Sequence, residues 1–213
     1  MNTTCRIFLT FASNLVVSLA VAGGFYAGGE MGVSTVPDLK NTAFQTMVDS
    51  GYTTTTVSQN NGSGQAAIFG GQWVTDNFGW EASLASLGSI KGRIAATNGT
   101  STIFTSYRYS AGALSLTAMG GVNVTPAGKI FFKAGAYGAG VTYDGPTSTV
   151  SASSAGPVLG GGFSYAVMKH VIARVEVADY IGVRYPNYEF FAPANSTTKT
   201  NIKVLAVGAA YEF

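Results

Sequence analysis

Apolar side chains recur at every second position along most of this chain, and small or polar residues fill the positions between them. The segment FGWEASL at 78–84 is typical, with Phe78, Trp80 and Leu84 on one parity and Glu81 and Ser83 on the other. Because successive side chains of a β-strand point to opposite faces of its sheet, this period of two predicts strands. The alternation predicts eight of them, at about 24–34, 66–75, 78–90, 104–124, 129–143, 157–167, 171–183 and 201–213.

The connections between these strands alternate strictly between short and long. Three are tight turns, at 75–77, 125–128 and 168–170. Four are long, at roughly 35–65, 91–103, 144–156 and 184–200. An up-and-down meander with all tight turns at one end produces this order, which is typical of barrels with short periplasmic turns and long outer loops.

Composition decides which side of the barrel is apolar. Charged residues make up only 10% of the 213-residue chain, against roughly 25% in a typical soluble domain. The second parity of the strands is rich in Gly, Ser and Ala, which suits a narrow interior and not a water-exposed surface. The sequence therefore predicts an all-β protein, an eight-stranded antiparallel up-and-down transmembrane β-barrel with four long outer loops and three short periplasmic turns. A soluble barrel with apolar residues inside is the alternative that this pattern disfavours.

The first 22 residues are expected to be a cleaved signal peptide. A single basic residue, Arg6, precedes an apolar run of about 16 residues, and Ala20-Val21-Ala22 has the small-x-small pattern of a cleavage site. Cleavage would leave 23–213 as the barrel domain and remove Cys5, the only cysteine. A retained membrane anchor is the alternative, but the run is short for one.

The last strand, VLAVGAAYEF at 204–213, ends on an aromatic residue without a polar tail. Its parity places Val207 toward lipid and Gly208 toward the lumen, where a small polar side chain is expected to be tolerated. Trp80, Tyr165, Tyr211 and Phe213 all lie near the tight turns and are expected to form an aromatic belt at the inner membrane interface.

The chain resembles the OmpA-type family of eight-stranded outer-membrane β-barrels. The matching segments are FYAGGEMGVS, GGQWVTDNFGWEASL, GPVLGGGFSYAVMKHVIARVEV and the terminal VGAAYEF, which together span most of the chain after the signal segment. The resemblance implies a bacterial outer-membrane location and a last strand, with Tyr211 and Phe213, that the barrel-assembly machinery reads. The family's namesake carries a peptidoglycan-binding domain after its barrel, which this sequence lacks, so tethering to the cell wall is not implied.

Five charged residues fall on the inward parity, and a sixth falls on the outward one. Buried charges are costly unless they pair, so we expect Glu30, Glu81, Lys133, Arg174 and Glu176 to form a charge network across the lumen. Either this network is a structural plug or it lines a gated ion path. Asp179 falls on the outward parity, for which a bulge or a position above the hydrocarbon is the expected explanation.

The outer loops carry the residues expected to meet partners. Tyr185, Tyr188, Phe190 and Phe191 cluster in the loop at 184–200 and are candidates either for contact with a partner or for packing on the barrel rim. Phe44 and Met47 are candidate anchors of the first loop. Basic residues near the outer rim are candidates for contact with lipopolysaccharide phosphates: Lys40, Lys91, Arg93, Arg108, Arg184 and Lys203.

Catalysis is not expected. The only histidine, His170, lies in a tight turn at the inner end, and no cysteine remains after cleavage, so base-assisted nucleophiles are missing. No cofactor, metal cluster or nucleic-acid partner is expected. Two functions remain open, a structural and surface-interaction protein of the outer membrane, with a possible host or envelope partner at its outer loops, or a small channel for ions or solutes.

Overall fold

The computed structural model describes residues 24–35, 38, 40, 44, 47–48, 51–60, 62–145, 149–186 and 197–213. Within them the chain forms nine strands: β1 (Phe25–Thr35), β2 (Thr54–Gln59), β3 (Gly62–Trp73), β4 (Phe78–Thr97), β5 (Thr102–Asn123), β6 (Gly128–Asp144), β7 (Thr149–Met168), β8 (Val171–Pro186) and β9 (Thr197–Glu212). In the described part of the chain, no helix has both the length and the apolar character needed to cross a membrane. The predicted signal segment 1–22 lies outside the described residues.

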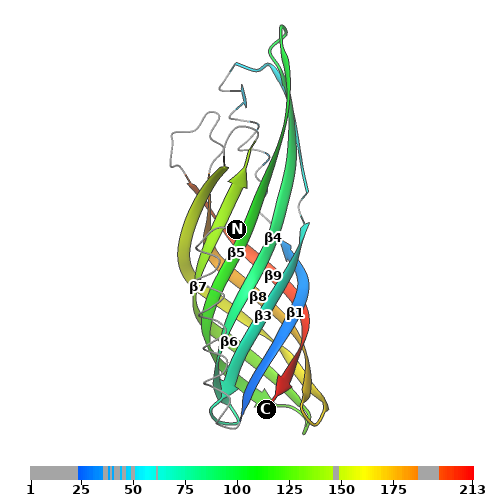
Figure 1. The fold of residues 1–213 in the computed structure, drawn as a ribbon, viewed down its shortest axis with the longest axis vertical. Helices are drawn as coiled ribbons and strands as arrows, with labels where there is room; N and C mark the ends of the chain where they lie inside the picture. The colour runs from blue at the N-terminus through cyan, green and yellow to red at the C-terminus, as the bar shows by residue number, and fades with distance from the viewer. Residues whose placement is uncertain are drawn as a thin grey trace.

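Eight strands close into a ring, as the alternation of the sequence predicts. Each strand pairs antiparallel with its neighbours in the order β3-β1-β9-β8-β7-β6-β5-β4, and the β3–β4 ladder completes the circle. The two ends of the chain meet in the β1–β9 ladder, where Met31 lies opposite Val207. Figure 1 shows these strands tilted around one axis, with the C-terminus at the end that holds the tight turns. The prediction of an eight-stranded up-and-down barrel is confirmed.

The strands run further outward than the sequence predicted. The segments 91–103 and 144–156, expected as loops, are mostly strand, and the connections that remain are 98–101 and 145–148. At the tip of the β4–β5 hairpin, Asn98 and Gly99 form the turn, with Gly99 at φ +86° and the Asn98 side chain accepting hydrogen bonds from the amides of Thr100 and Ser101. Asn-Gly is a strong hairpin signal, which explains why the chain turns here with so few residues.

The outer part of β4 carries an extra strand. β3 pairs with β4 only as far as Ser86, and beyond it β2 takes over the same edge of β4 from Gly92 to Thr97. β5 pairs with β6 only up to Arg108, so residues 102–107 pair with β4 alone. A three-stranded sheet, β2-β4-β5, thus projects from the outer end of the barrel, where Figure 1 shows the long β4–β5 hairpin.

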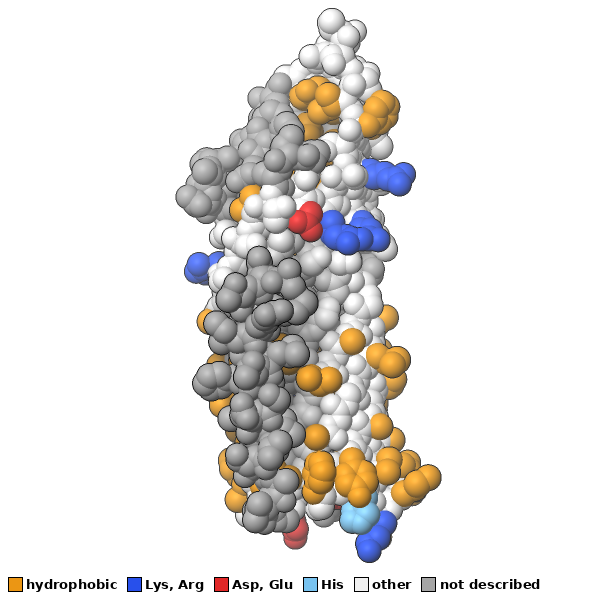
Figure 2. All heavy atoms as spheres, viewed as in Figure 1, with side chains coloured by type: hydrophobic (Ala, Val, Ile, Leu, Met, Phe, Trp, Pro, Cys, Tyr) orange, Lys and Arg blue, Asp and Glu red, His pale blue; other side chains and the backbone are white. Residues whose placement is uncertain are grey.

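Side chains face inward and outward as the parity predicts. Large apolar residues on the outward parity are exposed, among them Leu84, Leu116 and Phe132, while Ser83, Thr117 and Lys133 beside them are buried. In a membrane that exposed apolar surface contacts lipid and not water. Figure 2 shows hydrophobic side chains gathered near the lower end of this face, with further ones near the upper end, and most of its basic side chains in the upper half.

Two bulges shift the parity on the outer side. The β4–β5 register slips between Ser86 and Gly88, where Gly88 adopts φ +93° and Leu87 turns inward to full burial. The β8–β9 register slips between Tyr180 and Val183. Asp179 lies one residue before the second bulge, opposite Lys203, and is half-buried.

Candidate functional site

The middle of the lumen is closed by the five inward charges that the sequence singled out. Glu81 of β4 stands at the centre. Its Oε2 accepts hydrogen bonds from Arg174 Nη1 at 2.6 Å and from the Tyr26 hydroxyl at 3.0 Å, and its Oε1 accepts one from Lys133 Nζ at 3.2 Å. These donors come from β8, β1 and β6, so the contacts link strands on opposite sides of the ring.

Glu176 and Glu30 complete this charge layer. Both Lys133 Nζ and the second guanidinium nitrogen of Arg174 form ion pairs with the Glu176 carboxylate. Glu30 lies further out, with its Oε2 at 3.8 Å from Arg174 Nε and its Oε1 accepting from Gln65 Nε2 at 3.4 Å. All five charged side chains are at most 8% exposed.

Three carboxylates thus share two cations. In a buried site, removal of one cation leaves carboxylates without a partner, and the desolvation that they have already undergone is then uncompensated. Loss of either Lys133 or Arg174 is therefore expected to lower the stability of the barrel. The same ion pairs connect β1, β4, β6 and β8 across the lumen.

An aromatic layer closes the lumen on the inner side of these charges. Tyr26, Phe69, Met119 and Phe131 are buried and pack together with Ala210, and Trp73 borders them. The Arg174 guanidinium lies over the rings of Phe69 at 4.2 Å and Phe131 at 5.0 Å. The faces of these rings add a favourable environment for the buried cation.

A second aromatic layer fills the outer half of the lumen. Tyr109 is at its centre, with ring centroids 5.0 Å from Tyr143, 5.7 Å from Tyr185 and 5.8 Å from Tyr107. Tyr137 and Tyr180 pack against one another below them, and Met47 of the first loop is also fully buried in this cluster. The sequence reasoning missed this tyrosine layer, although Tyr107 and Tyr109 share the inward parity of β5.

The structure corrects the placement of one predicted loop residue. Tyr185 was a candidate either for contact with a partner or for packing on the barrel rim; it lies in β8 and not in the loop, with only 2% of its surface exposed, and packs on Tyr109. The bulge after Tyr180 turns Val183 and Tyr185 inward, which the parity of an unbroken strand does not reveal. Tyr188, Phe190 and Phe191 lie outside the described residues. Of the two candidate anchors of the first loop, Phe44 is exposed and Met47 is buried in the lumen.

Basic residues at the outer rim form two cross-strand pairs of like charge. Lys91 lies directly opposite Arg108 in the β4–β5 ladder, and Arg184 lies opposite Lys199 in the β8–β9 ladder. Arg93 is one outward step beyond Lys91, Lys203 lies opposite Asp179, and Lys40 pairs with Asp38 at 3.6 Å. Like charges placed directly opposite one another destabilise a sheet.

The last strand ends in a small aromatic group on the outside. Tyr211 is exposed, stacks on His170 with centroids 5.5 Å apart, and meets Phe213 edge-on at 5.3 Å. The Phe213 amide donates to the Phe25 carbonyl, which ties the chain end to β1. Tyr165 is also exposed, while Trp80 is half-buried. Among the described residues, no group of His, Cys, Asp or Glu is arranged to hold a metal ion.

Comparison with known proteins identifies the same architecture. Residues 21–213 match the profile of the family described as OmpA-like transmembrane domain. No curated protein sequence matches the chain.

Three solved structures illustrate the likeness. OprG, an outer-membrane protein of Pseudomonas aeruginosa, is 16% identical with a TM-score of 0.55, covering 90% of this chain and 96% of its own. Neisserial surface protein A is 14% identical with a TM-score of 0.53, covering 89% and 97%. The N-terminal β-barrel domain of Pseudomonas aeruginosa OprF is 11% identical with a TM-score of 0.50, covering 90% and 98%. At these identities the likeness shows the fold alone.

Proposed function

The chain belongs to the family of OmpA-like transmembrane domains, and on that premise we propose that it is a closed, non-enzymatic outer-membrane barrel with a structural and surface-interaction role. It is a bacterial outer-membrane β-barrel embedded in lipid. The observation that carries the proposal is the filled lumen. Two buried aromatic clusters lie on either side of one charge layer inside the barrel, which leaves the outer surface as the part best placed to act on other molecules.

The projecting β2-β4-β5 sheet is the surface most suited to a partner. It extends beyond the ring, and β2 ends the strand order, so its second edge has no strand partner among the described residues. Phe104 on β5 is 81% exposed there. Exposed aromatic side chains outside the hydrocarbon often mark contact sites, and a free strand edge offers backbone groups for pairing.

The proposed partners follow from position. Lipid surrounds the apolar band, and the basic rim pairs face the zone where lipopolysaccharide carries its phosphates. The barrel-assembly machinery is the proposed partner of the last strand with Tyr211 and Phe213. A host or envelope molecule is the proposed partner of the projecting sheet and loops.

A small channel is the alternative function. It would need a continuous water path past Tyr143, Glu81 and Phe131, all of which are at most 2% exposed. Opening such a path would separate desolvated charges that hold one another in place, which is costly. The filled lumen therefore favours the structural and surface role.

The role of the projecting sheet can be tested by shortening it. Arg93 and Ser106 are directly opposite in the β4–β5 ladder, so replacing residues 94–105 by Asn-Gly keeps the register and closes the hairpin lower down. Cells producing the shortened protein are expected to bind less to epithelial monolayers and serum-coated surfaces, while their resistance to detergent stays that of cells with the full protein. Heat-modifiable gel mobility checks that the shortened barrel is folded.

A finer variant, Phe104→Ser, is expected to reduce binding without changing the hairpin, and Thr100→Ser at the tip serves as its control. Undiminished binding by the shortened protein would rule out the projecting sheet as the contact surface.

A further inference from the structure

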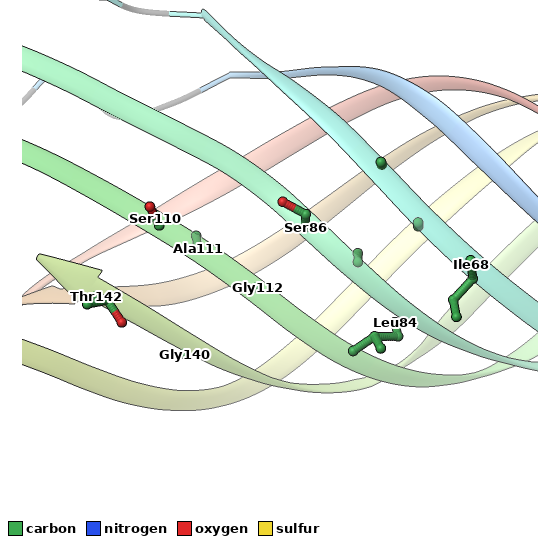
Figure 3. A pocket seen from close by; sticks show the side chains of 11 residues that line it. Ile68, Leu84, Ser86, Ser110, Ala111, Gly112, Gly140 and Thr142 are labelled. Atoms are coloured by element: carbon green, nitrogen blue, oxygen red, sulfur yellow. The ribbon is translucent and has the colours of Figure 1, made fainter. Parts of the chain in front are cut away.

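The outer face of the barrel is hollowed over β3, β4, β5 and β6. The hollow has a volume of about 600 Å³. Residues from these four neighbouring strands line it, and none comes from the opposite wall, so it opens to the outside and not into the lumen. Figure 3 shows Ile68 and Leu84 on one flank and Gly140 and Thr142 on the other, with Ser86, Ser110 and Gly112 between them.

The hollow exists because outward side chains become small at this height. Outward positions on β5 run Leu116 and Leu114, then Gly112 and Ser110, and those on β6 include Gly138 and Gly140 before Thr142 and Asp144. A Cβ added at Gly140 would meet nothing within 4 Å. The large apolar residues lie on the inner side, so the hollow is at the outer edge of the apolar band.

Basic residues stand at the outer mouth of this hollow. Arg108 is one outward step beyond Ser110 on β5, about 7 Å along the strand, and Lys91 lies directly opposite it on β4. Arg93 follows Lys91 at the next outward position. All three are exposed, and within the described residues none has an ion pair with an acid. Asp144 lies opposite Arg108 on the β6 side, where it accepts a hydrogen bond from Thr149.

We infer that this face is a binding site for a phosphorylated, acylated lipid of the outer leaflet, with a phosphate between Lys91 and Arg108 and an acyl chain in the hollow. The inference rests on the proposed contact with lipopolysaccharide and assigns it to one place on the wall. The charge arrangement favours this occupant, because Lys91 and Arg108 repel one another across the ladder, and a phosphate between them would accept charge-assisted hydrogen bonds from both. Asp144, which lies opposite Arg108 on β6, would repel an anion, so the phosphate is expected on the β4–β5 side of Arg108.

The lining fits the linkage region of such a lipid. Ser86 and Ser110 have hydroxyls without a hydrogen-bond partner in the described part of the chain, and they lie between the cations and the apolar flank. They can donate to the ester or amide carbonyls that join acyl chains to a phosphorylated headgroup. Ile68 and Leu84, which are exposed, then bound the chain on its inner side.

The second rim pair provides a matched control. Arg184 and Lys199 are also facing cations near the outer rim, but the facing pair Asp179 and Lys203 lies on the strands below them, and neither β8 nor β9 lines the hollow. Lys91→Gln/Arg108→Gln and Arg184→Gln/Lys199→Gln therefore remove equal charge, each from two exposed cations that face one another across a ladder. Only the first pair stands above the hollow.

The folded barrel in zwitterionic micelles is titrated with diphosphorylated lipid A, and native mass spectrometry counts the bound lipid. Lys91→Gln/Arg108→Gln is expected to weaken binding about tenfold, since charge-assisted hydrogen bonds are lost, while the control pair binds as the unchanged protein does. Inorganic phosphate lacks the acyl chains, and the single negative charge of the phosphodiester in phosphatidylcholine is already neutralised by its own choline group, so neither is expected to compete.

The hollow is tested separately by filling it. Gly140→Leu places a lipid-compatible side chain in open space inside the hollow and is expected to weaken lipid A binding. Gly120→Leu places the same side chain in open space near the inner end of β5 and is expected to leave binding unchanged.

If both double substitutions weaken lipid A binding equally, the lipid is held by the general positive charge of the rim, and the proposed site is wrong. Undiminished binding by Gly140→Leu would likewise overturn it. If the unchanged protein binds no lipid A, the site and the proposed lipopolysaccharide contact both fail.

Discussion

Replacing Arg174 by methionine is expected to lower the free energy of unfolding in lipid vesicles by about 3–5 kcal/mol. Arg174 contacts Glu81, Glu176 and Glu30, and its loss leaves these three buried carboxylates with Lys133 as the one cation near them among the described residues. Methionine fills much of the same volume, so the effect reports the charge and not a cavity. Urea titration followed by heat-modifiable gel mobility measures it.

Arg184→Met is the control, because it removes an exposed arginine from the same strand and is expected to change stability by less than about 0.5 kcal/mol. A double-mutant cycle with Glu81→Gln should show strong coupling to Arg174→Met, since the two side chains are directly bonded. Additive effects in the cycle, or an Arg174 loss no larger than that of Arg184, would show that the charges do not support one another.

Placing an arginine at Val207 is expected to cost about 2–4 kcal/mol of stability in lipid. Val207 is 59% exposed and lies between Met31 of β1 and Val175 of β8, both of which are also exposed and apolar. A charge in this band would have to leave water for hydrocarbon. Folding into vesicles and urea titration give the loss.

Thr197→Arg serves as the comparison, because position 197 is an exposed polar site at the outer end of β9 and is expected to accept the charge without cost. A harmless Val207→Arg would mean that this face does not contact lipid.

The structure corrects the expectation for the neighbouring Gly208. Parity alone predicts that Gly208→Ser is tolerated, because the position faces the lumen. A Cβ at 208, however, would lie 2.6 Å from the Gly29 carbonyl oxygen and 2.7 Å from the Glu30 Cβ. Both neighbours belong to the paired strand β1, so the serine is expected to destabilise the barrel by crowding.

The ring and its two faces could be predicted from the sequence because they depend on local alternation. A period of two fixes which residues share a face, and few charges on the apolar face identify lipid as the solvent. For the same reason the five inward charges were found as a set. Which cation pairs with which carboxylate depends on the radius and stagger of the ring, which the sequence pattern does not give. Tyr26 donates directly to Glu81, but it is uncharged and so was not among the charged residues that the sequence singled out.

The outer half was harder to predict because irregular features interrupt the alternation there. The bulges at Gly88 and after Tyr180 reverse the parity, so alternation alone could not decide whether Tyr185 meets a partner or packs inside, where it is buried. The strands also continue into segments expected as loops, 91–97 and 149–156 among them. There most outward residues are no longer apolar, so the alternation that predicts strands is lost. Only Asn98-Gly99 signalled the short hairpin turn.

The central claim, that the lumen is closed, is tested most directly by planar-bilayer recording of the folded protein. With the charge layer held by Glu81, Lys133, Arg174 and Glu176, we expect no resolved conductance steps, even at high voltage and salt. Arg174→Met and Glu81→Gln are recorded beside it. Regular conductance steps in the unchanged protein, with an ion selectivity that these substitutions alter, would contradict the account and identify the barrel as a channel.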